Sequence, residues 1–236
     1  TTQVAALTTD QVAALTTAQI SVVTTTGVAA MSTAQVAAIE TTDVAQLKTS
    51  QVAVLTTAGT AALTTAQIQS ITTAGVAGLK TTQVAALTTD QVVALTSTQI
   101  STVTTAGIAA MTTAQVAAIE TTDVAQLKTS QVAALTTAGV AALTTDQVAA
   151  LTTAQISAIT TSGVAAMTTA QVAAIETTDV AQLKTSQVAA LTTAGTAALT
   201  TLQVQALTTS GVAALKTTQV AALTTDQVAA LTTAQI

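Results

Sequence analysis

The chain has 236 residues, half of them apolar, a net charge of −5, and no His, Cys, Trp, Tyr, Phe, Pro, Asn or Arg. Because His, Cys and clustered carboxylates supply most acid–base and metal chemistry, this composition predicts a non-enzymatic protein with no catalytic, cofactor-binding or metal-binding residues and no small-molecule substrate. The five scattered lysines disfavour a nucleic-acid partner, and membrane insertion is not expected because no apolar run approaches roughly 18 residues.

An eight-residue unit with the consensus L-T-T-x-Q-V-A-A repeats about 29 times along the chain. Leu7, Leu15 and Val23 begin an apolar column that keeps this period without a slip as far as Leu231. A fixed internal period is the mark of a repeat architecture. We therefore predict a single continuous octapeptide-repeat array over residues 1–236.

Longer copies of the pattern divide the array into blocks. Residues 107–135 recur at 163–191 with a single change, and the second block lacks the counterpart of residues 57–80. The blocks therefore differ in length by whole octads, which indicates that the octad is the structural unit. The copied blocks are residues 1–80, 81–136, 137–216 and 217–236.

Spacing within the octad favours a helix over a strand. Val12 and Leu15 are three residues apart, so they share one face of a helix but point to opposite faces of a strand. The two positions between them are mostly Ala, a strong helix former and a poor strand former. One continuous helix is excluded, because eight residues at about 100° each leave the apolar stripe about 80° out of phase.

We therefore predict an all-α fold, a repeat solenoid or superhelix in which each octad forms a helix of about six residues followed by a Thr-rich corner. Helices this short are unstable alone, so the Val and Leu columns must be buried by stacking neighbouring units. A β-solenoid is the alternative. The number of octads per turn and the handedness stay open.

Charged and capping residues support the helical interpretation. Thr8 and Gln11 fit a capping box, and all seven Asp residues fall in the expected first turn, where a helix favours negative charge. The lysines directly follow the Leu column, at the expected helix end. Where a charged residue replaces the first Thr, as at Lys48, we expect the next one, Thr49, to cap instead. The Asp residues are Asp10, Asp43, Asp90, Asp123, Asp146, Asp179 and Asp226, and the lysines are Lys48, Lys80, Lys128, Lys184 and Lys216.

Three residue types invite functional hypotheses, and for each we prefer a structural role. The Gly residues of the Gln column form no phosphate-binding motif, the isolated Asp residues form no calcium loop, and the Met residues lie in the Leu column as core fillers. Regular arrays of Thr would suit an ice- or lattice-binding surface, although capping already uses many of them. The Gly residues are Gly27, Gly59, Gly75, Gly107, Gly139, Gly163, Gly195 and Gly211, and the Met residues are Met31, Met111 and Met167.

Two resemblances accompany these patterns. Leu87-Thr88-Thr89-Asp90-Gln91-Val92-Val93-Ala94-Leu95 resembles the opening of a TAL-effector repeat, which implies only a helical conformation, because the 34-residue period and the base-reading positions are missing. The whole array resembles the L-T-T-x-Q-V-A-A tracts of very long bacterial surface and adhesin-like proteins. That likeness implies an extracellular or cell-surface scaffold, spacer or fibre.

The functional prediction is a non-enzymatic structural scaffold, a rod or fibre segment of a large bacterial surface or secreted protein. Its expected partner is itself, end to end or within a longer array, because Val4, Leu7, Leu231 and Ile236 lack the polar capping repeat that usually covers the ends of a solenoid. The alternative is an ice- or lattice-binding protein that uses the Thr arrays.

Overall fold

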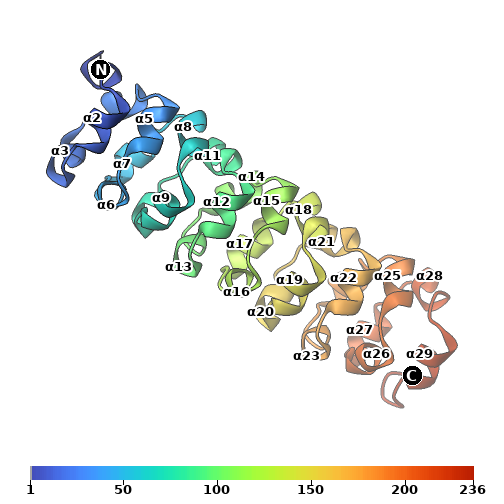
Figure 1. Cartoon of the computed structure of the whole chain (residues 1–236). Coiled ribbons are helices and arrows are strands. Elements are labelled where there is room, and N and C mark those ends of the chain that lie inside the picture. Colours follow the sequence, from blue (N-terminus) through green and yellow to red (C-terminus); the bar gives the residue numbers. More distant parts are fainter. Residues whose placement is uncertain (1) are drawn as a thin grey trace. The chain divides into compact units, whose positions relative to one another are not determined.

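The structure is a computed structural model that describes residues 2–236, and within them it contains 29 short α-helices and no strand (Figure 1). Each helix has four to six residues and corresponds to one octad. These helices confirm the predicted all-α repeat solenoid and exclude the β-solenoid. The chain forms two compact units, unit 1 (Thr1–Gln126) and unit 2 (Leu127–Ile236).

From α2 onward, each helix begins at the second Thr of its octad, or at Ser97, which replaces it in α13. Unit 1 contains α1 (Thr2–Ala5), α2 (Thr9–Ala13), α3 (Thr17–Val22), α4 (Thr25–Ala29), α5 (Thr33–Ala38), α6 (Thr41–Val44), α7 (Thr49–Val52), α8 (Thr57–Ala62), α9 (Thr65–Ser70), α10 (Thr73–Ala77), α11 (Thr81–Ala86), α12 (Thr89–Ala94), α13 (Ser97–Ile100), α14 (Thr105–Ala110), α15 (Thr113–Ala117) and α16 (Thr121–Val124). Unit 2 contains α17 (Thr129–Ala134), α18 (Thr137–Ala142), α19 (Thr145–Ala150), α20 (Thr153–Ile156), α21 (Thr161–Ala166), α22 (Thr169–Ala174), α23 (Thr177–Val180), α24 (Thr185–Val188), α25 (Thr193–Ala198), α26 (Thr201–Ala206), α27 (Thr209–Ala213), α28 (Thr217–Val220) and α29 (Thr225–Ala230).

A Thr or Ser side chain caps the start of most of these helices, and many of the caps are capping boxes, as the sequence predicts. In α12 the backbone N–H of Gln91 donates to Thr88 Oγ1 at 3.2 Å, and the N–H of Thr88 donates to Gln91 Oε1 at 2.8 Å. After α12, Leu95 has φ −61° and ψ 135°, and Thr96 has φ −76° and ψ 158°. Two extended residues therefore turn the chain, and no described non-glycine residue needs a positive φ.

The prediction that the cap moves by one residue in the charged octads is wrong. Lys48 is itself the N-cap of α7, and Thr49 is the first helical residue. The lysines therefore stand at helix starts rather than helix ends. Moving the cap would rotate the Val and Leu columns out of the core, so the backbone keeps its register and the charged side chain makes no cap hydrogen bond. The charged N-caps are Glu40, Lys48, Lys80, Glu120, Lys128, Glu176, Lys184 and Lys216.

The core of each unit consists of the Val and Leu columns, as predicted. In α7 and the corner after it, Val52 is fully buried and Leu55 is 4 % exposed. The three Met residues of the Leu column are also buried, which confirms them as core fillers. Each helix packs against the helix three octads away, so that α5 contacts α8, α8 contacts α11, and α11 contacts α14. The short helices thus become stable as layers of a coil.

Two glycines of the Gln column provide a matched test of packing. A Cβ added at Gly75 would lie 2.7 Å from Ile71 Cγ2, whereas at Gly59 the nearest atom is Thr56 Oγ1 at 3.1 Å and Leu55 stays 4.0 Å away. We expect Gly75→Ala to lower the free energy of unfolding by about 1–3 kcal/mol, because the β-branched Ile71 cannot retreat. Gly59→Ala should be neutral or stabilising by up to about 1 kcal/mol, because alanine favours the helix. Urea unfolding measures both, and equal losses would contradict this packing argument.

Candidate functional site

The described residues, 2–236, form no pocket, and no three Asp or Glu side chains among them gather as metal ligands would. Among the same residues, none of the helices combines the length and the apolar character needed to cross a membrane. The polar feature that recurs through both units is the Gln column. From Gln35 to Gln227 its glutamine side chains are buried, and they link separate layers of the coil.

Gln67 shows how this link is made. Its Nε2 donates to the carbonyl oxygens of Val36 at 3.0 Å and Ile39 at 2.6 Å, both on an earlier coil. Its Oε1 accepts from the backbone N–H of Thr64 at 2.7 Å, which is the second half of the capping box. The side chain is 2 % exposed. One carboxamide therefore caps its own helix and binds the end of another, and we call this arrangement the glutamine bracket.

The bracket recurs with constant spacing in sequence. The acceptors are the Val-column and Leu-column carbonyls that lie 31 and 28 residues before the glutamine, in the helix four octads earlier. Because the helices themselves pack three octads apart, one turn of the coil holds between three and four octads. Both carbonyls receive such bonds from Gln35, Gln51, Gln67, Gln83, Gln91, Gln99, Gln115, Gln171, Gln187, Gln203, Gln219, Gln227 and Gln235.

The bracket satisfies polar groups that the short helices leave open. Each helix ends after about one turn, so its last carbonyls have no partner within the helix, and an unpaired buried carbonyl costs about 1–3 kcal/mol. No buried side-chain polar atom of the described residues lacks a partner. Sequence reasoning assigned the glutamines only to caps and missed the second bond. The available signal was that this column contains only Gln, Gly or Asp.

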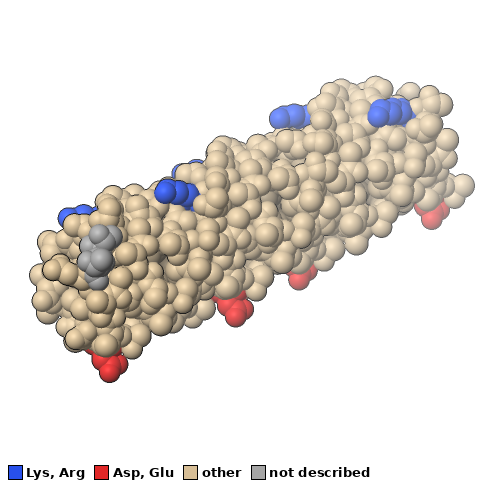
Figure 2. All heavy atoms as spheres, turned by 90° about the horizontal axis from the view of Figure 1, so that it is seen from above, with Lys and Arg blue, Asp and Glu red and all other residues tan. Residues whose placement is uncertain are grey.

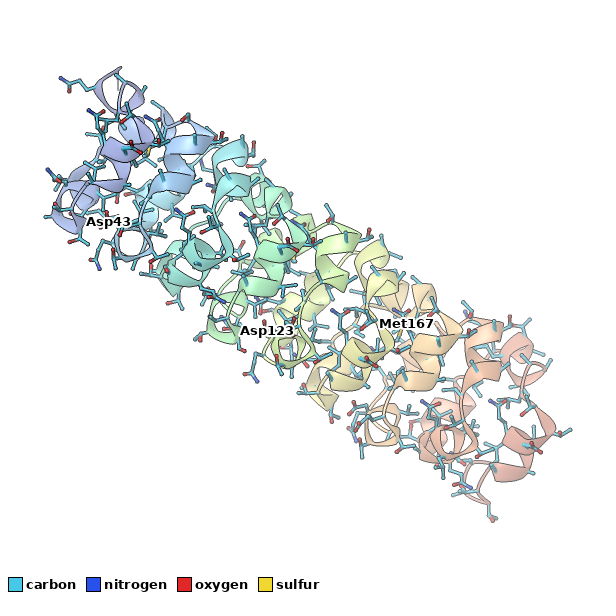
Figure 3. All side chains as sticks on the ribbon, viewed as in Figure 1. Asp43, Asp123 and Met167 are labelled. Carbon is cyan, nitrogen blue, oxygen red and sulfur yellow. The ribbon has the colours of Figure 1, made fainter. Side chains whose placement is uncertain are left out.

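Three aspartates replace the bracket glutamine: Asp43 in α6, Asp123 in α16 and Asp179 in α23. Figure 3 labels Asp43 and Asp123. A carboxylate cannot donate to carbonyls, and the side chains of Asp123 and Asp179 accept hydrogen bonds instead. Asp123 Oδ1 accepts from Ser97 Oγ at 2.5 Å, and Asp179 Oδ1 accepts from Thr153 Oγ1 at 2.7 Å. Burial raises the pKa of Asp43 above its usual value, and the nearby charge of Glu40 raises it further. All seven Asp lie in first turns, as predicted, but they are not brought together.

The glycines and threonines have structural roles. The N–H of Gly59 donates to Thr56 Oγ1 at 2.9 Å, so the glycine occupies a capped helix start. Thr60, in the Val column, is fully buried and donates its hydroxyl to the Thr56 carbonyl at 2.9 Å.

Comparison with known families shows one match. The sequence model of the ALTTAQ repeat matches residues 36–73, 70–105, 116–153, 172–209 and 210–236, which together include most of the chain. Comparisons with curated proteins and with solved structures gave no match.

Proposed function

Because the chain belongs to the ALTTAQ repeat family, we propose that it is a non-enzymatic structural scaffold, an extended segment of a rod or fibre. The glutamine bracket is the observation that carries this proposal. Each coil offers the next one the same carbonyls and receives the same carboxamides, so the array lengthens by adding octads without any new kind of contact. The charged residues are assigned no chemistry in this proposal, since they lie apart and border no pocket.

Self-association through the same coil surfaces is part of the proposal. Gln11 and Gln19 stand at bracket positions on the first coil, exposed and with no earlier coil in this chain to receive their Nε2 groups. The carbonyls of Leu215 and Leu223 occupy the corresponding acceptor positions of the pattern. Val228, in α29, is 48 % exposed. Donors at one end match acceptors at the other, so a second copy fits head to tail. In a longer array, further octads of the same chain would cover these surfaces.

The proposed location is the bacterial cell surface or the extracellular space. It is supported by the likeness of the octapeptide tract to those of very long surface proteins, and by no feature of the coil itself. Antibody labelling of intact producing cells tests it, and labelling only after the cells are opened would count against it.

Length scaling tests the scaffold proposal. Residues 1–232 fused to a second copy of residues 1–236 keep the octad phase across the junction. In small-angle X-ray scattering, we expect the radius of gyration to increase about twofold over the single chain, as for a rod. A compact globule would grow only about 1.3-fold and would refute the extended scaffold.

Sedimentation tests the end-to-end contact. Val4→Lys with Leu7→Lys should weaken concentration-dependent association without loss of helix. Association unchanged by these two substitutions would contradict the end-to-end contact.

A further inference from the structure

Exposed charges in each unit lie on two opposite edges. In Figure 2 the lysines that can be seen lie on one side of the surface, and the acidic residues that can be seen lie on the opposite side. All five lysines are exposed, and so are all acidic residues except the three buried aspartates of the Gln column. We call these the lysine edge and the acidic edge of a unit. The exposed charges of unit 1 are Lys48 and Lys80 with Asp10, Glu40, Asp90 and Glu120, and those of unit 2 are Lys128, Lys184 and Lys216 with Asp146, Glu176 and Asp226.

The coil geometry explains why charges distant in sequence share an edge. A turn holds between three and four octads, which is 24 to 32 residues. Lys48 and Lys80 are 32 residues apart, so they occupy the same edge on neighbouring coils. Asp90 and Glu120 are 30 residues apart and do the same on the acidic edge. The two edges therefore carry charge pairs of nearly equal separation in sequence.

The lysines are placed against the preference of the helix. At a charged N-cap, Lys or Glu replaces the Thr whose hydroxyl would accept from the first turn, and Ala at such a position typically costs about 1 kcal/mol. A lysine there also meets the positive end of the helix dipole, which disfavours it. Helix stability therefore does not account for Lys48 and Lys80. Residues that break a local rule point to a role outside the helix.

We propose that the edges are a lateral docking surface whose partner is a second copy of this array, lysine edge against acidic edge. Opposite charges at matched spacing set two coils of one copy beside two coils of the other. The pair keeps one free edge of each sign, so the contact is heterologous and open-ended, and arrays can join side by side into bundles or sheets. This contact is independent of the end-to-end contact, which uses apolar side chains and glutamine brackets.

Salt dependence follows from the nature of the contact. Exposed ion pairs are individually weak, and their attraction is screened as the Debye length shortens. Several pairs along one edge act together, so longer arrays should dock more tightly than short ones. Lateral association should be strong at low ionic strength and weaken at high ionic strength, whereas the apolar end-to-end contact should not.

An exchange variant tests the edges without changing composition. Glu40→Lys with Lys48→Glu, and the same exchange at Glu120 with Lys128 and Glu176 with Lys184, keeps the net charge and the number of charged caps but mixes the signs on both edges. By sedimentation equilibrium at about 20 mM salt, we expect the lateral association constant of the full chain to fall roughly tenfold. Electron microscopy should show narrower assemblies of unchanged length.

A control variant with all five lysines replaced by arginine keeps both edges and should associate as the parent does. Circular dichroism should show the same helix content in all three proteins. If the exchange variant associates as tightly as the parent chain, the proposal is overturned. So would a parent chain that forms no lateral contacts at about 20 mM salt, or one whose lateral contacts persist undiminished at about 500 mM.

Discussion

Gln67→Glu is expected to destabilise unit 1 by on the order of 3–5 kcal/mol at neutral pH. The introduced carboxylate can still accept from the Thr64 N–H, but it cannot donate to the carbonyls of Val36 and Ile39, which now receive Gln67 Nε2. It would also place a negative charge, 2 % exposed, against two carbonyl oxygens. Urea unfolding followed by circular dichroism measures the loss.

The free energy of unfolding that Gln67→Glu loses should be larger at neutral pH than at acidic pH. Burial and the facing carbonyls disfavour the charged form, so the pKa of the introduced carboxyl is higher in the folded than in the unfolded chain. Below the unfolded value of about 4.3, the carboxyl is protonated in both states and can donate to one carbonyl, so most of the stability returns. As the pH rises from there through the raised folded pKa, the folded state loses stability. A deficit equal at about pH 4 and about pH 7 would contradict this mechanism.

Gln11→Glu is the matched control. Gln11 has the same octad position and the same capping-box bonds, with Thr8 N–H donating to Gln11 Oε1 at 2.9 Å, but its side chain is exposed. The substitution should change the free energy of unfolding by less than about 0.5 kcal/mol. If Gln11→Glu and Gln67→Glu behave alike, the bonds between coils contribute little and the glutamines serve only as caps.

The features set by the octad itself could be predicted from the sequence. The three-residue spacing of Val12 and Leu15 implied a shared helical face, and both columns are buried where neighbouring coils cover them. The capping box of Thr8 and Gln11 followed from local spacing in the same way. Such features depend on residues within one turn of helix, and neighbouring residues carry the information directly.

Features that join coils could not be predicted. The bracket of Gln83 reaches Val52 and Leu55, and nothing in a uniform repeat says which earlier octad faces a given glutamine. The number of octads per turn depends on the extended Leu-Thr corner. The φ and ψ ranges allowed to that corner are compatible with several different numbers. The lysines were placed at helix ends for a similar reason: residues such as Lys48 lie between two helices, and only the geometry shows that they begin the second.

Removing half an octad is expected to have the second large effect. Deleting residues 57–60 leaves only Ala61 and Ala62 between Thr56 and Leu63. Two residues are too few for a helix and its corner, so α8 cannot form. The helices α5 and α11 both pack on α8 and would lose that layer. Leu63 could no longer reach the core, and loss of one buried leucine alone costs about 2–5 kcal/mol. We expect local unfolding around the deletion while unit 2 keeps its helices.

Deleting the whole octad, residues 57–64, is the control and should cost little. Every later helix keeps its phase, and Gln91 then finds the carbonyls of Val52 and Leu55 four octads before it, in place of Thr60 and Leu63.

Trypsin digestion measures the local unfolding in both variants, because the chain has no Arg and only five Lys at which trypsin can cleave. Cleavage after Lys48 and Lys80, which flank the deletion, should be fast only in the half-octad variant, and cleavage after Lys216 should stay slow in both. Only a coil built from octads distinguishes a deletion of four residues from a deletion of eight. If Lys48 and Lys80 are equally protected from cleavage in the two variants, the octad is not the unit of the coil.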